Sequence, residues 1–224
     1  MDTQTRTALV AGASGLVGGF LLDTLLEDSQ YREVHSLGRR PLPRQHPKLV
    51  QHTVDFARLG SEALPPAQDA FCCLGTTIKK AGSQEAFRAV DHGAVLAFAK
   101  ATRKAGARRF LVVTALGANP DSRVFYNRVK GEVERDLQGM GFESLVILQP
   151  SLLLGERAES RPGERAAIVA SRVLAPLLRP FGSRPIEART VARAMVALAR
   201  EAPRGVRVAP SGELQELGRP RRGG

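Results

Sequence analysis

The stretch Thr7-Ala8-Leu9-Val10-Ala11-Gly12-Ala13-Ser14-Gly15-Leu16-Val17-Gly18 decides the fold of this 224-residue chain. A short apolar run ends in three glycines spaced by three, and an amphipathic segment over residues 20–27 follows. A strand, a glycine turn and a helix in this order suit the pyrophosphate of a dinucleotide. Gly12 permits the tight turn, Gly15 lets the phosphate approach the backbone, and Gly18 lets the helix pack closely on the strand. The helix N-terminus then directs free N–H groups and a partial positive charge at the phosphates.

Strand-like and helix-like segments alternate along the chain as far as residue 148. The spacing predicts further strands at 33–37, 49–56, 69–74, 109–114 and 144–148, and helices at 83–105 and 123–140. Such alternation is typical of an α/β fold, a doubly wound parallel sheet of the Rossmann type. We therefore expect one NAD(P)-binding domain over residues 1–212.

The pattern loosens after Pro150. The sequence predicts helices at 166–178 and 187–200 and a last strand at 206–208. We expect residues 151–200 to form a small cover on the substrate side of this single domain. The apolar stripe of the first of these helices either lines a substrate pocket or packs on the sheet, and packing explains it without a ligand. The Arg-, Gly- and Pro-containing segment 213–224 is expected to be a disordered tail.

Composition excludes some classes of partner. The formal net charge is +11, from 33 Lys and Arg against 22 Asp and Glu. These positive residues are scattered and aromatic residues are few, so we expect no nucleic-acid partner. No stretch of about 18 uncharged apolar residues exists, so we expect no membrane span. Cys72 and Cys73 are adjacent and the N-terminal residues are polar, which favours a cytoplasmic protein without a disulfide or metal framework.

The tip of the second predicted strand indicates which dinucleotide binds. Gly38-Arg39-Arg40 follows this strand, where the adenosine ribose lies in a dinucleotide fold. An acidic residue would accept a hydrogen bond from the 2′-hydroxyl of NAD, whereas two arginines suit the 2′-phosphate of NADP. The alternative is a solvated Arg pair in an Arg-rich chain. Asp55, after the third strand, either bonds the adenine amino group or caps a turn.

Three residues have the chemistry that a carbonyl reduction needs. Tyr126 and Lys130 are four apart on a predicted helix, so both project from one face. A tyrosine donates and regains a proton near neutral pH only when a nearby ammonium lowers its pKa, and Lys130 is in position to do so. Thr114 ends the fifth strand, where its hydroxyl can polarise a carbonyl. The alternative for Tyr126 and Lys130 is an ordinary pair of exposed side chains on one helix face.

The sequence resembles the atypical short-chain dehydrogenases/reductases, and more narrowly the Tat-interacting oxidoreductase family with its bacterial relatives. The resemblance rests on Gly38-Arg39-Arg40, Cys72-Cys73-Leu74-Gly75-Thr76-Thr77, Val129-Lys130-Gly131-Glu132-Val133-Glu134 and Glu159-Ser160-Arg161-Pro162-Gly163-Glu164. It implies a Rossmann fold, NADPH binding and catalytic positions for Tyr126 and Lys130. Two departures from the family are Thr114-Ala115 in place of Ser-Ser or Ser-Ala, and Gln149-Pro150 in place of Arg-Pro.

We therefore predict an NADPH-dependent oxidoreductase acting on a carbonyl of a small substrate, with Tyr126, Lys130 and Thr114 as catalytic residues. The alternative is a redox-sensing regulatory protein that binds NADPH with little or no turnover. A homodimer or a protein partner is compatible with either function. The expected cofactor contacts are Gly12, Ser14, Gly15, Leu16, Val17, Arg39, Arg40, Asp55, Leu74, Gly75, Thr76, Tyr126, Lys130, Pro150 and Leu152.

Overall fold

The computed structural model describes residues 5–61, 63–155 and 184–219. Within them, a seven-stranded parallel sheet has the order β3-β2-β1-β4-β5-β6-β9. Its strands are β1 (Arg6–Ala11), β2 (Tyr31–Gly38), β3 (Leu49–Thr53), β4 (Asp69–Cys72), β5 (Arg109–Val113), β6 (Ser144–Gln149) and β9 (Gly205–Pro210). The strand order reverses between β1 and β4, which is the point where doubly wound folds bind their ligands. The predicted Rossmann-type fold is confirmed.

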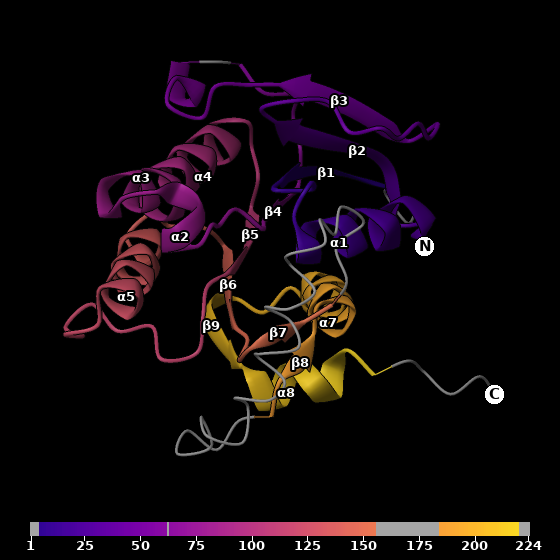
Figure 1. Cartoon of the computed structure of the whole chain (residues 1–224). Helices are drawn as coiled ribbons and strands as arrows, with labels where there is room; N and C mark the ends of the chain where they lie inside the picture. Colours follow the sequence, from indigo (N-terminus) through magenta and orange to yellow (C-terminus); the bar gives the residue numbers. More distant parts are fainter. Residues whose placement is uncertain (1–4, 62, 156–183, 220–224) are drawn as a thin grey trace.

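Helices cover both faces of this sheet (Figure 1). On one face, α1 (Leu16–Glu27), α7 (Ala188–Glu201) and α8 (Ser211–Leu217) pack on β1 and β6 through a core that includes Val10, Leu25 and Met195. On the other face lie α4 (Val95–Lys104) and α5 (Phe125–Gln138), whose core includes Phe98 and Leu137. Because the middle strands are buried on both sides, they are continuous apolar runs.

The long helix predicted over 83–105 is divided into three parts. It consists of α3 (Gln84–Arg88), a π-helical segment η2 (Ala89–Ala94) and α4, after the short elements η1 (Leu59–Ser61) and α2 (Ile78–Ala81). Ser83 caps α3, since its Oγ accepts a hydrogen bond from the backbone N–H of Ala86 at 3.1 Å. The wider π turn lets Asp91 point inward between Phe87 and Val95, and all three side chains are buried.

The C-terminal part differs from the expectation. The described part of the expected cover contains a two-stranded parallel sheet of β7 (Leu153–Leu154) and β8 (Ile186–Glu187), but helix α7 belongs to the layer that packs on the main sheet beside α1. The first residues of the segment expected to be a disordered tail, 213–217, belong to α8, because Leu214 has an apolar core to pack on. The predicted helix at 166–178 and residues 220–224 lie outside the described residues. No helix in the described ranges is long and apolar enough to cross a membrane.

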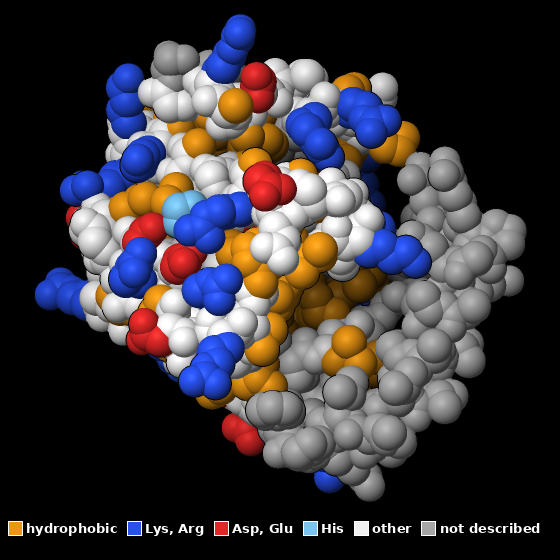
Figure 2. All heavy atoms as spheres, turned by 60° about the vertical axis from the view of Figure 1, so that its left-hand side comes forward, with side chains coloured by type: hydrophobic (Ala, Val, Ile, Leu, Met, Phe, Trp, Pro, Cys, Tyr) orange, Lys and Arg blue, Asp and Glu red, His pale blue; other side chains and the backbone are white. Residues whose placement is uncertain are grey.

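Lys and Arg side chains are spread over the face shown in Figure 2, with Asp and Glu side chains between them. Several charges of the described residues are paired, for example Arg88 with Glu132 and Arg135 with Asp136. The expectation that no nucleic acid binds rests on this scattered pattern and stays a prediction.

Candidate functional site

The glycine turn after β1 has the geometry that the sequence predicts. Gly12 has φ of +87°, and a Cβ built there would lie 2.5 Å from the backbone carbonyl atoms of Cys73. A Cβ on Gly18 would lie 2.1 Å from the carbonyl oxygen of Gly12, so only glycine allows α1 to pack against the turn. The turn closes with a 2.9 Å hydrogen bond from Gly15 N–H to Gly12 O. The two glycines therefore fix where α1 begins relative to β1.

The N-terminus of α1 is free to bind an anion. Gly15 is its N-cap, no side chain caps the helix, and no acidic residue occupies the first turn. The N–H groups of Leu16 and Val17 lie in the first turn, where no helical carbonyl is present four residues earlier, so they are available to phosphate oxygens. The side chain of Val17 is buried in the core, which limits this residue to backbone contacts, whereas Ser14 is exposed. These features fit the pyrophosphate of a dinucleotide.

Arg39 and Arg40 follow β2 at the same edge of the sheet. Leu37 pairs with Ala11 in the register of β1 and β2, so the tip of β2 lies beside the glycine turn. Both arginines are exposed, and no interaction of either guanidinium is recorded among the described residues. Asp55 caps a turn, since its Oδ1 accepts a hydrogen bond from Ala57 N–H at 3.0 Å, and its contact with the adenine stays a prediction.

The segment after β4 joins the glycine turn to the predicted catalytic residues. Cys73 N–H donates a 2.8 Å hydrogen bond to Ala11 O, which holds this segment against β1. Thr76 N–H donates a 2.8 Å hydrogen bond to Asp91 Oδ2. A Cβ built on Gly75 would lie 3.4 Å from Asp91 Oδ1 and 3.7 Å from Lys130 Nζ. The backbone at Gly75 therefore passes directly over the Asp91–Lys130 pair.

Lys130 is a buried ammonium with a carboxylate partner. Its Nζ lies 2.7 Å from Asp91 Oδ1, and both side chains are almost fully buried. Burial lowers the pKa of Lys130, but Asp91 and Tyr126 raise it, and the net pKa is above the ordinary value. Lys130 is thus positively charged at neutral pH. Tyr126, one helical turn earlier, is half-buried, with its ring 5.6 Å from that of Phe87.

The hydroxyl of Thr114 forms its hydrogen bond within the protein. Its Oγ1 donates to Glu134 Oε1 at 2.5 Å and lies 3.2 Å from Leu148 O. Gln149 Nε2 in turn donates to both oxygens of Glu134, at 3.0 and 2.9 Å. Burial raises the pKa of Glu134 above its ordinary value, although the hydrogen bonds and Lys130 act in the opposite direction. The hydroxyl predicted to polarise a substrate carbonyl is therefore directed at Glu134.

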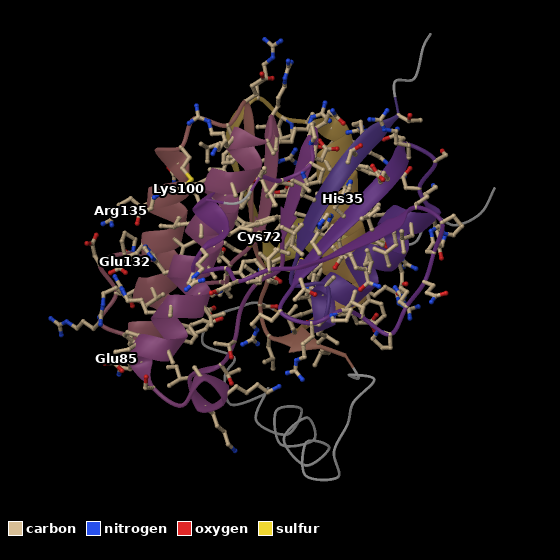
Figure 3. All side chains as sticks on the ribbon, turned by 90° about the horizontal axis from the view of Figure 1, so that it is seen from above. His35, Cys72, Glu85, Lys100, Glu132 and Arg135 are labelled. Atoms are coloured by element: carbon tan, nitrogen blue, oxygen red, sulfur yellow. The ribbon has the colours of Figure 1, made fainter. Side chains whose placement is uncertain are left out.

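The two cysteines are not suited to nucleophilic chemistry. Figure 3 shows Cys72 near the middle of the molecule, whereas Arg135 of α5 lies near its left-hand edge. Burial raises the pKa of the Cys72 thiol to about 12 and raises that of Cys73 as well. Both are free thiols that stay protonated at neutral pH.

Pro150 and Leu152, the last two predicted cofactor contacts, follow β6. Pro150 is buried and its carbonyl accepts a 2.9 Å hydrogen bond from Leu116 N–H, while Leu152 is exposed. The structure thus brings the residues after β1, β2, β4, β5 and β6 to one edge of the sheet. Asp55 follows β3, the outermost strand of the sheet on this side.

No protein-family model matches the chain. "Protein FMP52, mitochondrial" of Eremothecium gossypii is 38% identical over 157 residues, covering 70% of this chain and 70% of the relative. "Protein HTATIP2" of Rattus norvegicus is 37% identical over 167 residues, covering 72% of this chain and 68% of the relative. The chain belongs to the FMP52/HTATIP2 family. With its fold, this places it among the atypical short-chain dehydrogenases/reductases, and the resemblance seen in the sequence is confirmed.

Solved structures share the fold of this FMP52/HTATIP2 family member. MoeE5 in complex with UDP-glucuronic acid and NAD superposes with a TM-score of 0.70 at 22% identity, over 91% of this chain and 75% of that chain. A short chain dehydrogenase from Burkholderia cenocepacia in complex with NADP has a TM-score of 0.65 at 18% identity, over 93% and 89%. The fold is thus the NAD(P)-binding fold that these two solved structures share.

The relatives correct the predicted location. We expected a cytoplasmic protein from the cysteine content and the polar N-terminal residues. Several fungal members of the FMP52/HTATIP2 family, from Eremothecium gossypii, Aspergillus clavatus and Saccharomyces cerevisiae, are named mitochondrial proteins, which contradicts that expectation. Two adjacent thiols report a reducing environment, and such composition does not distinguish one reducing compartment from another.

Sequence reasoning missed three residues of the site: Asp91, Glu134 and Gln149. Asp91 had a signal, because it interrupts the apolar face of the helix predicted over 83–105, four residues after Phe87 and four before Val95. Glu134 had one too, since it follows Tyr126 and Lys130 at the same four-residue spacing on one helix face. Gln149 stood out only as a departure from the family pattern, and its partner lies on another element.

Proposed function

We propose that this member of the FMP52/HTATIP2 family is an NADP(H)-dependent oxidoreductase that reduces a carbonyl group of a small substrate by hydride transfer. Tyr126 donates the proton to the carbonyl oxygen, and Lys130 stabilises the phenolate that remains. The observation that carries this proposal is the buried, charged ammonium of Lys130, held by Asp91 one helical turn after Tyr126. It lies directly beneath the segment that contacts the glycine turn.

The electrostatics of the pair support this chemistry. A tyrosine has an ordinary pKa of about 10, so it gives up its proton reluctantly near neutral pH. A cation nearby favours the phenolate and lowers this barrier. Asp91 keeps Lys130 charged although it is buried, so the cation is present when Tyr126 needs it. A bound reduced nicotinamide supplies the hydride, and the proton lost from Tyr126 is regained from solvent.

The preference for NADP(H) is supported by Arg39 and Arg40. Their exposed guanidinium groups follow β2, beside the glycine turn, and no acidic residue occupies the tip of this strand. Guanidinium groups bind phosphate with charge-assisted and often bidentate hydrogen bonds. The related folds include both NAD and NADP complexes, so the fold alone is compatible with either nucleotide.

The test is oxidation of NADPH by the purified protein with a panel of aldehydes, ketones and quinones, beside the variant Tyr126→Phe. We expect at least one compound to be reduced, and Y126F to lower the rate by about 10²-fold or more, the range of general acid catalysis. NADPH affinity of Y126F, measured by fluorescence titration, is expected to stay within about threefold of the parent. Full turnover by Y126F would remove Tyr126 from the mechanism.

The occupied hydroxyl of Thr114 favours a second function, that of an NADPH-binding regulatory protein with little turnover. A site whose hydroxyl donor faces inward binds nucleotide without polarising a carbonyl. Tight NADPH binding with no reduction of any compound in the panel would support this function. A protein partner whose affinity changes with NADPH occupancy would then be the next finding to seek.

A further inference from the structure

The hydroxyl of Thr114 has a single hydrogen and two acceptors within reach. Glu134 Oε1 is 2.5 Å from Thr114 Oγ1, and Leu148 O is 3.2 Å from it. The shorter contact is to a carboxylate, which is the stronger acceptor. Thr114 follows β5 directly, at the edge of the sheet where the glycine turn and Lys130 lie. Its hydroxyl is thus at the site but is turned away from any ligand there.

We propose that Glu134 is a positioning residue whose protonation state decides whether Thr114 can donate a hydrogen bond to the carbonyl substrate. This inference rests on the proposed reductase function and adds a control of the same site.

The two protonation states of Glu134 give Thr114 opposite roles. When Glu134 is ionised, its Oε1 accepts the hydrogen of Thr114, and the hydroxyl has no hydrogen left for a substrate. When Glu134 takes up a proton, its own O–H donates to Thr114 Oγ1 across the same 2.5 Å contact. The hydrogen of Thr114 is then released from the carboxylate, and a substrate carbonyl competes for it only with Leu148 O at 3.2 Å. The exchange needs one proton and no movement of the backbone.

The surroundings of Glu134 allow both protonation states. The residue is buried beneath Thr114, and its partner from β6 is the neutral amide of Gln149. A guanidinium at position 149 would hold the carboxylate in its ionised form, whereas an amide leaves that form without a directly bonded cation. Burial raises the pKa of Glu134 as a net effect, which brings its titration closer to neutral pH.

The groups that face Glu134 come from three elements. On α5 itself, Lys130 is the charged group that acts on it, and it lowers the pKa of Glu134. Thr114 faces it from the end of β5, and Gln149 faces it from the end of β6; both are neutral at all pH values of interest. A pH dependence of the rate that disappears in a Glu134 variant is therefore due to the titration of this carboxyl group, whose pKa the charge of Lys130 lowers.

The experiment measures the pH dependence of single-turnover NADPH oxidation by a carbonyl compound from the panel that the protein reduces, in the parent protein and in Glu134→Gln. In the parent we expect the rate to fall about tenfold per pH unit above the pKa of Glu134, as the proton is lost. In E134Q the amide oxygen accepts from Gln149 Nε2 when the amide nitrogen donates to Thr114 Oγ1, and this side chain has no proton to lose as the pH rises. The variant should therefore keep the acid-side rate across the range, with NADPH affinity within about threefold of the parent. An E134Q profile that follows the parent would overturn the proposal.

Two further variants separate positioning from a purely structural role. Thr114→Val should lower the acid-side rate by about 10²-fold, as for loss of one donor to a developing oxyanion. In a T114V background, E134Q should then change nothing further, since Glu134 acts through that hydroxyl. An equal loss from E134Q with and without T114V would contradict the proposal.

Gln149→Leu tests the same proposal with Glu134 in place, in case E134Q does not fold. Removing the amide donors disfavours the ionised carboxylate, so the midpoint of the rate profile should move about one unit toward higher pH. An unmoved midpoint would overturn the proposal. If NADPH binds but no carbonyl compound is reduced by the parent protein, the proposed reductase function is wrong, and so is the proposed role of Glu134. If a carbonyl compound is reduced but the pH–rate profiles of the variants match that of the parent, only the proposed role of Glu134 is wrong.

Discussion

Lys130 Nζ lies 2.7 Å from Asp91 Oδ1, and both side chains are shielded from solvent between α5 and the π-helical segment η2. The second oxygen of Asp91 accepts the N–H of Thr76, so one carboxylate orients the ammonium and the segment that follows β4. A buried ion pair contributes little net stability by itself, but removal of one partner leaves an unpaired buried charge. The pair is therefore best tested by changing Asp91 alone.

Asp91→Asn should lower the free energy of unfolding by about 3 kcal/mol, because Lys130 loses the charge that compensates its burial. The same change lowers the pKa of Lys130, so turnover should fall more than NADPH affinity. Chemical denaturation and NADPH titration measure the two effects.

The matched control is Asp136→Asn, which removes another α5 partner of η2. Asp136 Oδ2 lies 2.9 Å from His92 Nε2, but this pair is partly exposed. D136N should cost less than about 1 kcal/mol. Equal losses in both variants would show that burial of the Lys130 pair has no special effect.

Gly18→Ala should disrupt the nucleotide site through backbone packing. The new Cβ would lie 2.1 Å from Gly12 O, which cannot give way without moving the turn. We expect a loss of about 3 kcal/mol in unfolding free energy and loss of measurable NADPH binding.

The neighbouring glycine of the same helix supplies the control for Gly18. A Cβ on Gly19 would meet Ala13 O at 3.7 Å, an ordinary contact. Gly19→Ala should therefore keep NADPH affinity and stabilise the helix by about 0.5–1 kcal/mol. Retained NADPH binding in G18A would mean that the turn is more adaptable than its geometry indicates.

Removing the arginines at the tip of β2 should reduce the discrimination between the two nucleotides. In Arg39→Ala/Arg40→Ala, the dissociation constant for NADPH is expected to rise about 10- to 100-fold, the equivalent of one or two charge-assisted hydrogen bonds, and that for NADH to stay the same. Arg204→Ala is the control, because Arg204 is also exposed but precedes β9 at the opposite edge of the sheet. A parent protein that binds both nucleotides equally would contradict the preference for NADP(H).

The histidine pair on β2 and β3 predicts a pH-dependent stability. His35 Nδ1 and His52 Nε2 are 2.8 Å apart, and Glu33 Oε2 lies 3.1 Å from His35 Nε2; His35 is labelled in Figure 3. Burial and then the charge of His35 lower the pKa of His52, although Glu33 acts in the opposite direction. Below pH about 6.5, the pKa of a histidine in the unfolded chain, the unfolded chain binds a proton at His52 that the folded protein does not yet bind. The free energy of unfolding therefore falls as the pH falls.

His52→Gln should remove this contribution. The free energy of unfolding, measured by urea denaturation between pH 7.5 and 5.5, should then fall less steeply than in the parent, by at most about 1.4 kcal/mol per pH unit, the limit for one proton. His46→Gln, a change of an exposed histidine in the β2–β3 connection, serves as the control. A slope that H52Q leaves unchanged would show that other groups account for the pH dependence.

Much of this protein was readable from local patterns. Gly12, Gly15 and Gly18 predict their turn because the left-handed φ of Gly12 and the contacts of Gly15 and Gly18 with Gly12 arise within a dozen residues. The four-residue spacing of Tyr126 and Lys130 defines a helix face wherever that helix packs. The boundaries of the edge strands and of the C-terminal elements were less well predicted. The helix α8 forms because Leu214 has a core to enter, and that core is built from α1 and α7, which are distant in the sequence.

The sequence by itself determined the doubly wound sheet, the nucleotide turn and the identity of the predicted catalytic residues, because apolar periodicity and glycine geometry act over short distances. Only the tertiary structure decided which groups these residues contact. Lys130 gains Asp91 from a segment 39 positions earlier, and Thr114 donates to Glu134 on α5, which is bonded in turn to Gln149 on β6. The charge on a buried lysine and the direction of a hydroxyl depend on such partners, and partners meet only when the strands and helices pack.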